Sequence, residues 1–281
     1  MLALGLGLAA AVCWGFHDIC VRQVSQNTPL MAALMAVLIA GSALQLGIMG
    51  ATDAFAPVPR DAVIYAAISG AFFLIASLGL YGAFQRGPVR LVAPVIASYP
   101  ILSVGWAAAN GTPVSVTEWL AVLAIIAGVS IVAVLSDDSD GDVQPKGRTI
   151  FYALIAAVGF AGTFAIGQLA TEMAHDLPII LITRLVAILL LAVLMIARRS
   201  PFWPGRAVMP VLIVMGCLDG IALMAVLSAG GLPNAQYAAV ASSIFGLLTI
   251  VMAWGFLKER MTPAQWGGCG LTFAAIGYLA L

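Results

Sequence analysis

The chain closes with AQYAAVASSIFGLLTIVMAWGF (residues 235–256), KER (258–260) and TPAQWGGCGLTFAAIGYLAL (262–281). These are two apolar runs on either side of a charged turn. Each run has about the 20 residues that an α-helix needs to cross the hydrocarbon core of a bilayer. Charged residues between two such runs belong at the membrane surface, because an ionised side chain is costly inside the bilayer. The stretch therefore predicts a transmembrane hairpin.

A weaker copy of this hairpin occupies residues 88–135. ASYP (97–100) stands where the later copy has SSIFG (242–246), and TEW (117–119) stands where the later copy has AQW (264–266). The matching tryptophans, Trp119 and Trp266, lie roughly half the chain apart. The correspondence predicts a duplicated membrane protein.

The composition points to the same class of protein. Hydrophobic residues form 63% of the 281 residues and charged residues 9%, with a mean hydropathy of +1.09. In soluble domains, hydrophobic residues average about 45–50% and charged residues about 25%. A formal net charge of +0 offers no basic surface for nucleic acid. The four cysteines lie in apolar runs without CxxC spacing, which indicates packing residues, and we expect no metal or cofactor.

Turn residues divide the chain into ten predicted transmembrane helices, an all-α polytopic fold. We expect residues 1–136 to form one five-helix repeat, 137–148 an acidic linker and 149–281 a second five-helix repeat. Five is an odd number, so the second repeat enters the membrane from the opposite face, which predicts two inverted repeats around a central cavity. The predicted helices cover residues 2–21, 30–50, 62–85, 89–109, 116–136, 149–170, 178–197, 207–229, 234–256 and 263–281.

The basic residues predict the orientation. Of the 12 Lys and Arg residues, all but Arg60 and Arg184 lie at the connections that follow the first, third, fifth, seventh and ninth helices. Positively charged connections face the cytoplasm. Both termini are therefore predicted to lie outside the cytoplasm.

Asp219 and Arg184 lie well inside predicted helices, where an ionisable residue requires a partner or a wet cavity. Asp219, near the middle of the eighth helix, is interpreted either as a carboxylate that binds a proton or a substrate amine, or as a structural carboxylate bonded to a neighbouring helix. Gly216 and Gly220 flank it and permit close approach of another helix. Arg184 in the seventh helix can face a substrate carboxylate, pair with a carboxylate such as Asp219, or extend to the surface; the structural interpretations are favoured.

His17 and Asp18 lie near the end of the first helix. Asp18 precedes Arg22 by four residues, so an ion pair on one helix face is the favoured interpretation. His17 is either a proton relay or a hydrogen-bonded packing residue. Aromatic and hydroxyl side chains of other helices complete the predicted pocket. The predicted substrate-binding residues are Trp14, His17, Tyr81, Ser98, Tyr99, Asp219, Ser242 and Ser243, with Arg184 and Asp18 as a possible charge pair or coupling groups.

Trp14-Gly15, Arg184 soon after a proline and WGFLKERMTP (254–263) resemble the drug/metabolite transporter superfamily, EamA type, and within it the YddG-like amino-acid exporters. The resemblance implies a basket-shaped bundle with a central cavity in a bacterial inner membrane. Its partners would be a small-molecule substrate and the lipid bilayer, with the protein a monomer or loose dimer. Met35 and NGT (110–112) stand near the positions that Arg184 and KER occupy in the second repeat, so neither charged feature is symmetric.

The predicted function is a secondary transporter that exports small metabolites by alternating access, with amino acids expected, aromatic or other neutral ones included. A multidrug or nucleotide-sugar carrier of the same superfamily and an uncoupled facilitator are the alternatives. The chain lacks GxxxxGK[ST], which would couple ATP. It also lacks HExxH and GxSxG, and His17 and His175 lie far apart in sequence, which disfavours an enzyme.

Overall fold

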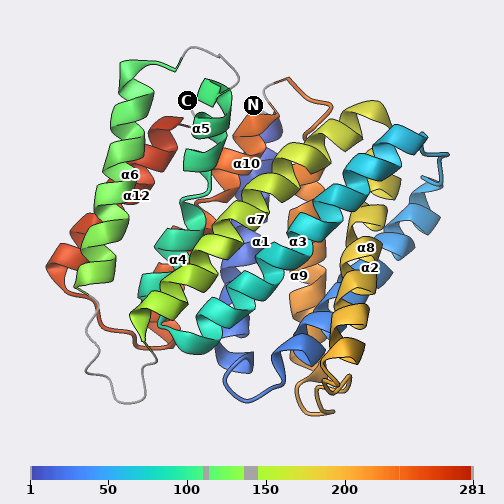
Figure 1. Cartoon of the computed structure of the whole chain (residues 1–281), viewed down its shortest axis with the longest axis horizontal. Helices are drawn as coiled ribbons and strands as arrows, with labels where there is room; N and C mark the ends of the chain where they lie inside the picture. The colour runs from blue at the N-terminus through green and yellow to red at the C-terminus, as the bar shows by residue number, and fades with distance from the viewer. Residues whose placement is uncertain (1, 110–113, 136–144, 234, 280–281) are drawn as a thin grey trace.

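The computed structural model describes residues 2–109, 114–135, 145–233 and 235–279, and the regular structure in these ranges is helical throughout. Eight helical segments there are long and apolar enough to cross a bilayer. Outward side chains such as Leu189 and Ile196 are 62% and 67% exposed, as expected where a helix faces lipid tails. The helices are α1 (Leu2–Val24), α2 (Leu30–Thr52), α3 (Arg60–Arg86), α4 (Val89–Ala97), α5 (Pro100–Ala109), α6 (Val116–Val134), α7 (Lys146–Met173), α8 (Asp176–Ala197), α9 (Met209–Leu227), α10 (Gln236–Ser242), α11 (Phe245–Phe256) and α12 (Pro263–Leu279) (Figure 1).

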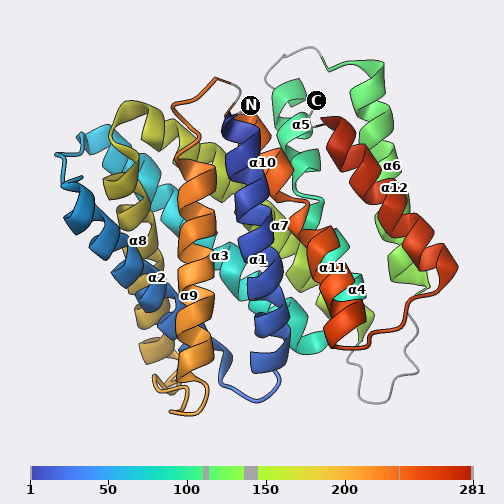
Figure 2. The ribbon, with the colours of Figure 1, turned by 180° about the vertical axis from the view of Figure 1, so that it is seen from behind.

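The contacts between the two repeats come in equivalent pairs, in which the first and the second repeat exchange roles. α3 packs along α7 as α9 packs along α1, and α2 packs on α9 as α8 packs on α3. α2 packs against its counterpart α8 at one side of the bundle, and α6 packs against its counterpart α12 at the opposite side (Figures 1 and 2). α1 and α7 run through the middle in opposite directions. The predicted pair of inverted repeats thus describes the all-α polytopic fold.

The two ends of the bundle differ in charge. The N- and C-termini lie together at one end, and the basic connections between α1 and α2, α3 and α4, α8 and α9, and α11 and α12 lie at the other (Figure 1). The acidic stretch 137–142 lies outside the described residues. At the basic end the Glu259 carboxylate accepts the backbone N–H groups of Val89 (3.0 Å) and Arg90 (3.2 Å). The second repeat therefore caps the first turn of α4 in the first repeat.

Two of the predicted helices, 89–109 and 234–256, are each broken in two. In the first, Pro100 has no N–H to donate, and the N–H groups of Ser98 and Tyr99 bond three residues back, to Val95 and Ile96. The Ser98 hydroxyl also donates to the Val95 carbonyl, at 2.7 Å. The break therefore falls at Ser98-Tyr99, between α4 and α5.

The second break has the same bonding without a proline. The N–H groups of Ser243 and Ile244 bond three residues back, and the Ser243 hydroxyl donates to the Val240 carbonyl at 2.6 Å. Beyond the break, Gly246 packs so closely on α4 that a Cβ there would lie 2.7 Å from the Cβ of Ala97. The two breaks thus occupy equivalent positions in the two repeats. The ends of the other eight helices agree with the prediction to within about three residues.

Candidate functional site

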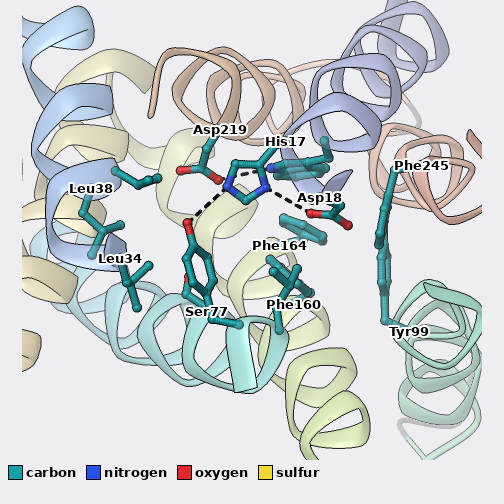
Figure 3. A pocket seen from close by; sticks show the side chains of 14 residues that line it. His17, Asp18, Leu34, Leu38, Ser77, Tyr99, Phe160, Phe164, Asp219 and Phe245 are labelled. Atoms are coloured by element: carbon teal, nitrogen blue, oxygen red, sulfur yellow. Dashed lines mark hydrogen bonds and ion pairs between the residues drawn. The ribbon is translucent and has the colours of Figure 1, made fainter. Parts of the chain in front are cut away.

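A pocket opens in the middle of the bundle, between the two repeats (Figure 3). The space between its lining side chains, including the part open to the exterior, is about 440 Å³. Much of it consists of narrow gaps, so a bound metabolite would push the lining apart. The lining residues come from α1, α2, α3, α7, α9 and α11 and from the first helix break: Trp14, His17, Asp18, Leu34, Val37, Leu38, Ser77, Leu80, Tyr81, Tyr99, Phe160, Phe164, Asp219 and Phe245.

Helix α1 supplies the polar side of this pocket. Trp14, His17 and Asp18 are spaced by three and four residues and so share one helix face. They are 5%, 4% and 0% exposed. On a neighbouring face Gly7 and Gly15 bring α1 against α10 and α11, since a Cβ at Gly7 would lie 2.4 Å from a backbone oxygen of α10. Close packing through Gly7 and Gly15 therefore fixes the face of α1 that carries the three pocket-lining side chains.

Asp219 is bonded on both sides. Its Oδ1 accepts the indole N–H of Trp14 at 3.2 Å, and its Oδ2 lies 2.9 Å from Nη2 of Arg184. The ion pair is close without being aligned as a hydrogen bond, and no hydrogen bond to a described residue reaches Nε, Nη1 or Nη2 of Arg184. Arg184 is fully buried and lies outside the pocket lining. Pairing with Asp219, one of the alternatives for Arg184, is thus the observed arrangement.

Glycines make room for this pair. A Cβ at Gly41 of α2 would lie 2.0 Å from Nη2 of Arg184 and 2.7 Å from the carbonyl oxygen of Gly216. A Cβ at Gly216 would lie 2.5 Å from the carbonyl oxygen of Val37 in α2. The predicted close approach at Gly216 and Gly220 therefore occurs between α9 and α2, and the guanidinium fills the space beside Gly41.

Asp18 does not form the predicted pair with Arg22. Its Oδ1 lies 3.0 Å from Nδ1 of His17, and Nε2 of that ring lies 3.5 Å from the hydroxyl of Tyr81. Arg22 instead donates to the Phe84 carbonyl at 2.7 Å. The reason is depth: Asp18 faces the buried pocket, while Arg22 reaches the end of α3. The second carboxylate oxygen of Asp18, Oδ2, is buried and has no hydrogen-bond partner among the described residues.

Tyr99 joins the two helix breaks. Its hydroxyl donates to the Ala239 carbonyl, whose usual helical donor, the Ser243 N–H, bonds to Val240 instead. The Ser242 hydroxyl lies 2.6 Å from the Tyr99 hydroxyl and donates to the same carbonyl. Ser98 and Ser243 bond within their own breaks. All three serines lie outside the pocket lining, whereas Trp14, His17, Tyr81, Tyr99, Asp219 and Asp18 line it.

Aromatic rings form much of the remaining wall. Phe160 and Phe164 of α7 stack with centroids 5.7 Å apart, and Phe164 lies 5.5 Å from Trp14 and 5.4 Å from Tyr99. Neither phenylalanine is among the site residues predicted from the sequence. Their i, i+4 spacing on a glycine-containing helix is the available signal, but it is equally typical of packing. Among the described residues no group of three or more His, Cys, Asp or Glu side chains could hold a metal ion.

Comparisons with known proteins agree with the fold. The sequence model of the EamA-like transporter family matches residues 1–134 and again 147–281. A solved structure, titled only "Crystal structure of protein", aligns with a TM-score of 0.70 over 98% of this chain and 95% of its own, at 15% identity. At that identity the likeness concerns the fold alone. No curated protein sequence matches this chain.

Proposed function

The chain belongs to the EamA-like transporter family, a membrane transporter family of the drug/metabolite transporter superfamily, and we propose that it exports small metabolites, amino acids first among them, as a secondary transporter. The observation that carries this proposal is the buried pocket of aromatic rings and carboxylates between two inverted repeats. Carriers with inverted repeats place their substrate near the bilayer midplane at the repeat interface, beside discontinuous helices. The breaks at Ser98-Tyr99 and Ser243-Ile244 lie beside this pocket and give each repeat a bending point.

In this proposal Trp14, His17, Tyr81, Tyr99 and Asp219 contact the substrate. Ser98, Ser242 and Ser243 support it indirectly, by holding the carbonyl groups of the two breaks. Aromatic rings favour an apolar or aromatic body, while carboxylates favour a cationic group. A neutral amino acid with an aromatic side chain offers both.

A second cavity supports a route to the basic end of the bundle. It has about 950 Å³ of space, open solvent included, and lies between α2, α3, α7 and α8. Leu30 and Met31 line it one turn before Leu34 of the central pocket, and Gly82 follows Tyr81 on α3. We propose that this cavity is the cytoplasmic entrance and that both termini lie on the other side of a bacterial inner membrane. In the same proposal, residues 137–148 link the repeats 1–136 and 149–281. The protein is a monomer or loose dimer.

The nucleotide-sugar alternative is weaker on this geometry. A diphosphate calls for free cationic groups, and the described pocket lining contains neither Lys nor Arg, because Arg184 lies behind Asp219. A multidrug carrier fits the aromatic wall and remains the second candidate.

Counterflow in proteoliposomes without ATP tests the proposal. Vesicles are loaded with each natural amino acid in turn at two pH values, and uptake of the labelled amino acid is measured. We expect saturable exchange for a few apolar amino acids, lost in Phe164→Ala and kept in Phe151→Ala, a change on an exposed position of the same helix. Folded protein that exchanges no amino acid would contradict the proposal and favour a multidrug carrier.

A further inference from the structure

The pocket contains one carboxylate oxygen that nothing in the described structure satisfies. Asp18 is 0% exposed, its Oδ1 is bonded to His17, and its Oδ2 has no hydrogen-bond partner among the residues that the structure describes. Asp18 nevertheless belongs to the lining of the pocket that a ligand would enter. A buried acceptor of this kind is costly until a donor reaches it.

The charges around the pocket differ between its two carboxylates. Asp219 is balanced by Arg184 at 2.9 Å, whereas the ion-pair partner of Asp18 within the described parts of the chain is the His17 ring, at 3.0 Å. Figure 3 places the two carboxylates on opposite sides of that ring (Figure 3). In its ionised form, Asp18 therefore carries a negative charge that no Lys or Arg of the described pocket lining balances.

The surroundings of the pocket suit an organic cation. Trp14, Phe164, Tyr99 and Phe245 all line the same pocket as Asp18. The Trp14 ring lies 5.5 Å from that of Phe164 and 6.3 Å from that of Phe245, so the rings form a connected wall. Faces of such rings attract an ammonium group, most strongly when the site is desolvated.

We propose that Oδ2 of Asp18 accepts hydrogen bonds from the ammonium group of the transported molecule. The pocket then recognises primary amines with an apolar or aromatic body through their ammonium group, and amino acids are bound through that group too. A substrate carboxylate finds no Lys or Arg in the described lining and contributes little. This inference rests on the central pocket being the transport site of the proposed function.

Binding to the purified wild-type protein in detergent tests the charge preference, by isothermal titration with three probes that share one phenyl body: phenethylamine, phenylalanine and 3-phenylpropanoate. We expect phenethylamine to bind at least as tightly as phenylalanine, and 3-phenylpropanoate at least tenfold more weakly. A 3-phenylpropanoate affinity equal to that of phenethylamine would overturn the proposal without any variant having to fold.

The variant Asp18→Asn tests the residue. A hydrogen bond to a charged group is worth enough that its loss should weaken phenethylamine binding by about tenfold or more. Asp61→Asn, an exposed position in the first turn of α3, should bind as the wild type does. Unchanged phenethylamine binding in folded Asp18→Asn would refute the assignment.

The two proposals fail separately. If amines bind through Asp18 but proteoliposomes exchange neither amines nor amino acids, transport is contradicted and the binding site stands. If amino acids exchange equally well in wild type and in Asp18→Asn, transport stands and the ammonium site is overturned.

Discussion

Asp219→Asn tests the buried ion pair while changing the shape of the side chain very little. The amide oxygen can still accept the Trp14 indole N–H, which lies 3.2 Å from Oδ1 in the native protein. The negative charge 2.9 Å from Arg184 disappears. The substitution therefore removes the ion pair and leaves the rest of the contact in place.

The expected magnitude follows from the burial of the guanidinium. Arg184 is 0% exposed and its other donors have no hydrogen-bond partner among the described residues, so losing Asp219 isolates a charge. Removing one partner of a buried pair costs about 3–5 kcal/mol in soluble proteins. In a membrane the unfolded state also finds partners, so we expect about 3 kcal/mol for Asp219→Asn. We expect roughly 2 kcal/mol for Arg184→Met, because Asp219 retains Trp14 and faces the pocket.

A double-mutant cycle on the purified protein measures this coupling. Unfolding by SDS in mixed micelles gives the free energy for wild type, the two single variants and the double variant. We expect the double variant to be more stable than the sum of the single changes predicts by about 2 kcal/mol, because it contains neither isolated charge. Additive single effects, or a wild-type unfolding curve for Asp219→Asn, would refute the reasoning.

Three further predictions use the same unfolding assay. Gly41→Ala places a methyl group where the buried guanidinium lies and should cost about 2–4 kcal/mol, whereas Gly47→Ala, which faces open space on the same helix, should be neutral or slightly stabilising; equal effects would contradict the packing argument. Tyr99→Phe removes the hydroxyl that bonds α10 and should cost about 1–3 kcal/mol, with faster hydrogen exchange at the second break; wild-type exchange there would argue against this role. Glu259→Gln weakens the cap on α4 and should cost about 1 kcal/mol, while Glu172→Gln, an exposed change near the end of α7, should not; matching losses would exclude the cap as the cause.

Most of the fold was readable from hydropathy, and the exceptions have a local cause. Runs such as residues 178–197 predict a spanning helix because every backbone polar group must be bonded within the segment in lipid. In the fourth predicted helix the break has a cause visible in the sequence, because Pro100 has no N–H to donate. In the ninth predicted helix, the N–H of Ser243 bonds to the carbonyl three residues before it, and Gly246 packs closely on α4. Neither feature depends on hydropathy.

The candidate site was only partly predictable. Polar or amphipathic side chains stand out in an apolar helix, which is the basis for predicting Trp14, Tyr81, Tyr99 and Asp219 as site residues. All four line one pocket. The phenylalanines of α7 do not stand out in that way, since a ring in a membrane helix has the same appearance in sequence whether it faces lipid, packing or a cavity. Partner choice was the other gap: a four-residue spacing favoured Arg22 for Asp18, but depth in the bundle gave that carboxylate to His17.

Local composition and the parity of the helix count suffice to predict that the chain crosses a membrane many times, that it is built from two inverted repeats, and that Arg184 and Asp219 lie inside spanning helices. Only the packing of the helices shows that Arg184 balances Asp219, that Tyr99 bonds across to the second break, and that Asp18, a residue of the pocket lining, has one oxygen without a hydrogen-bond partner among the described residues. Buried polar groups bond to whatever donors packing brings within about 3 Å, and packing joins residues that lie far apart in the chain.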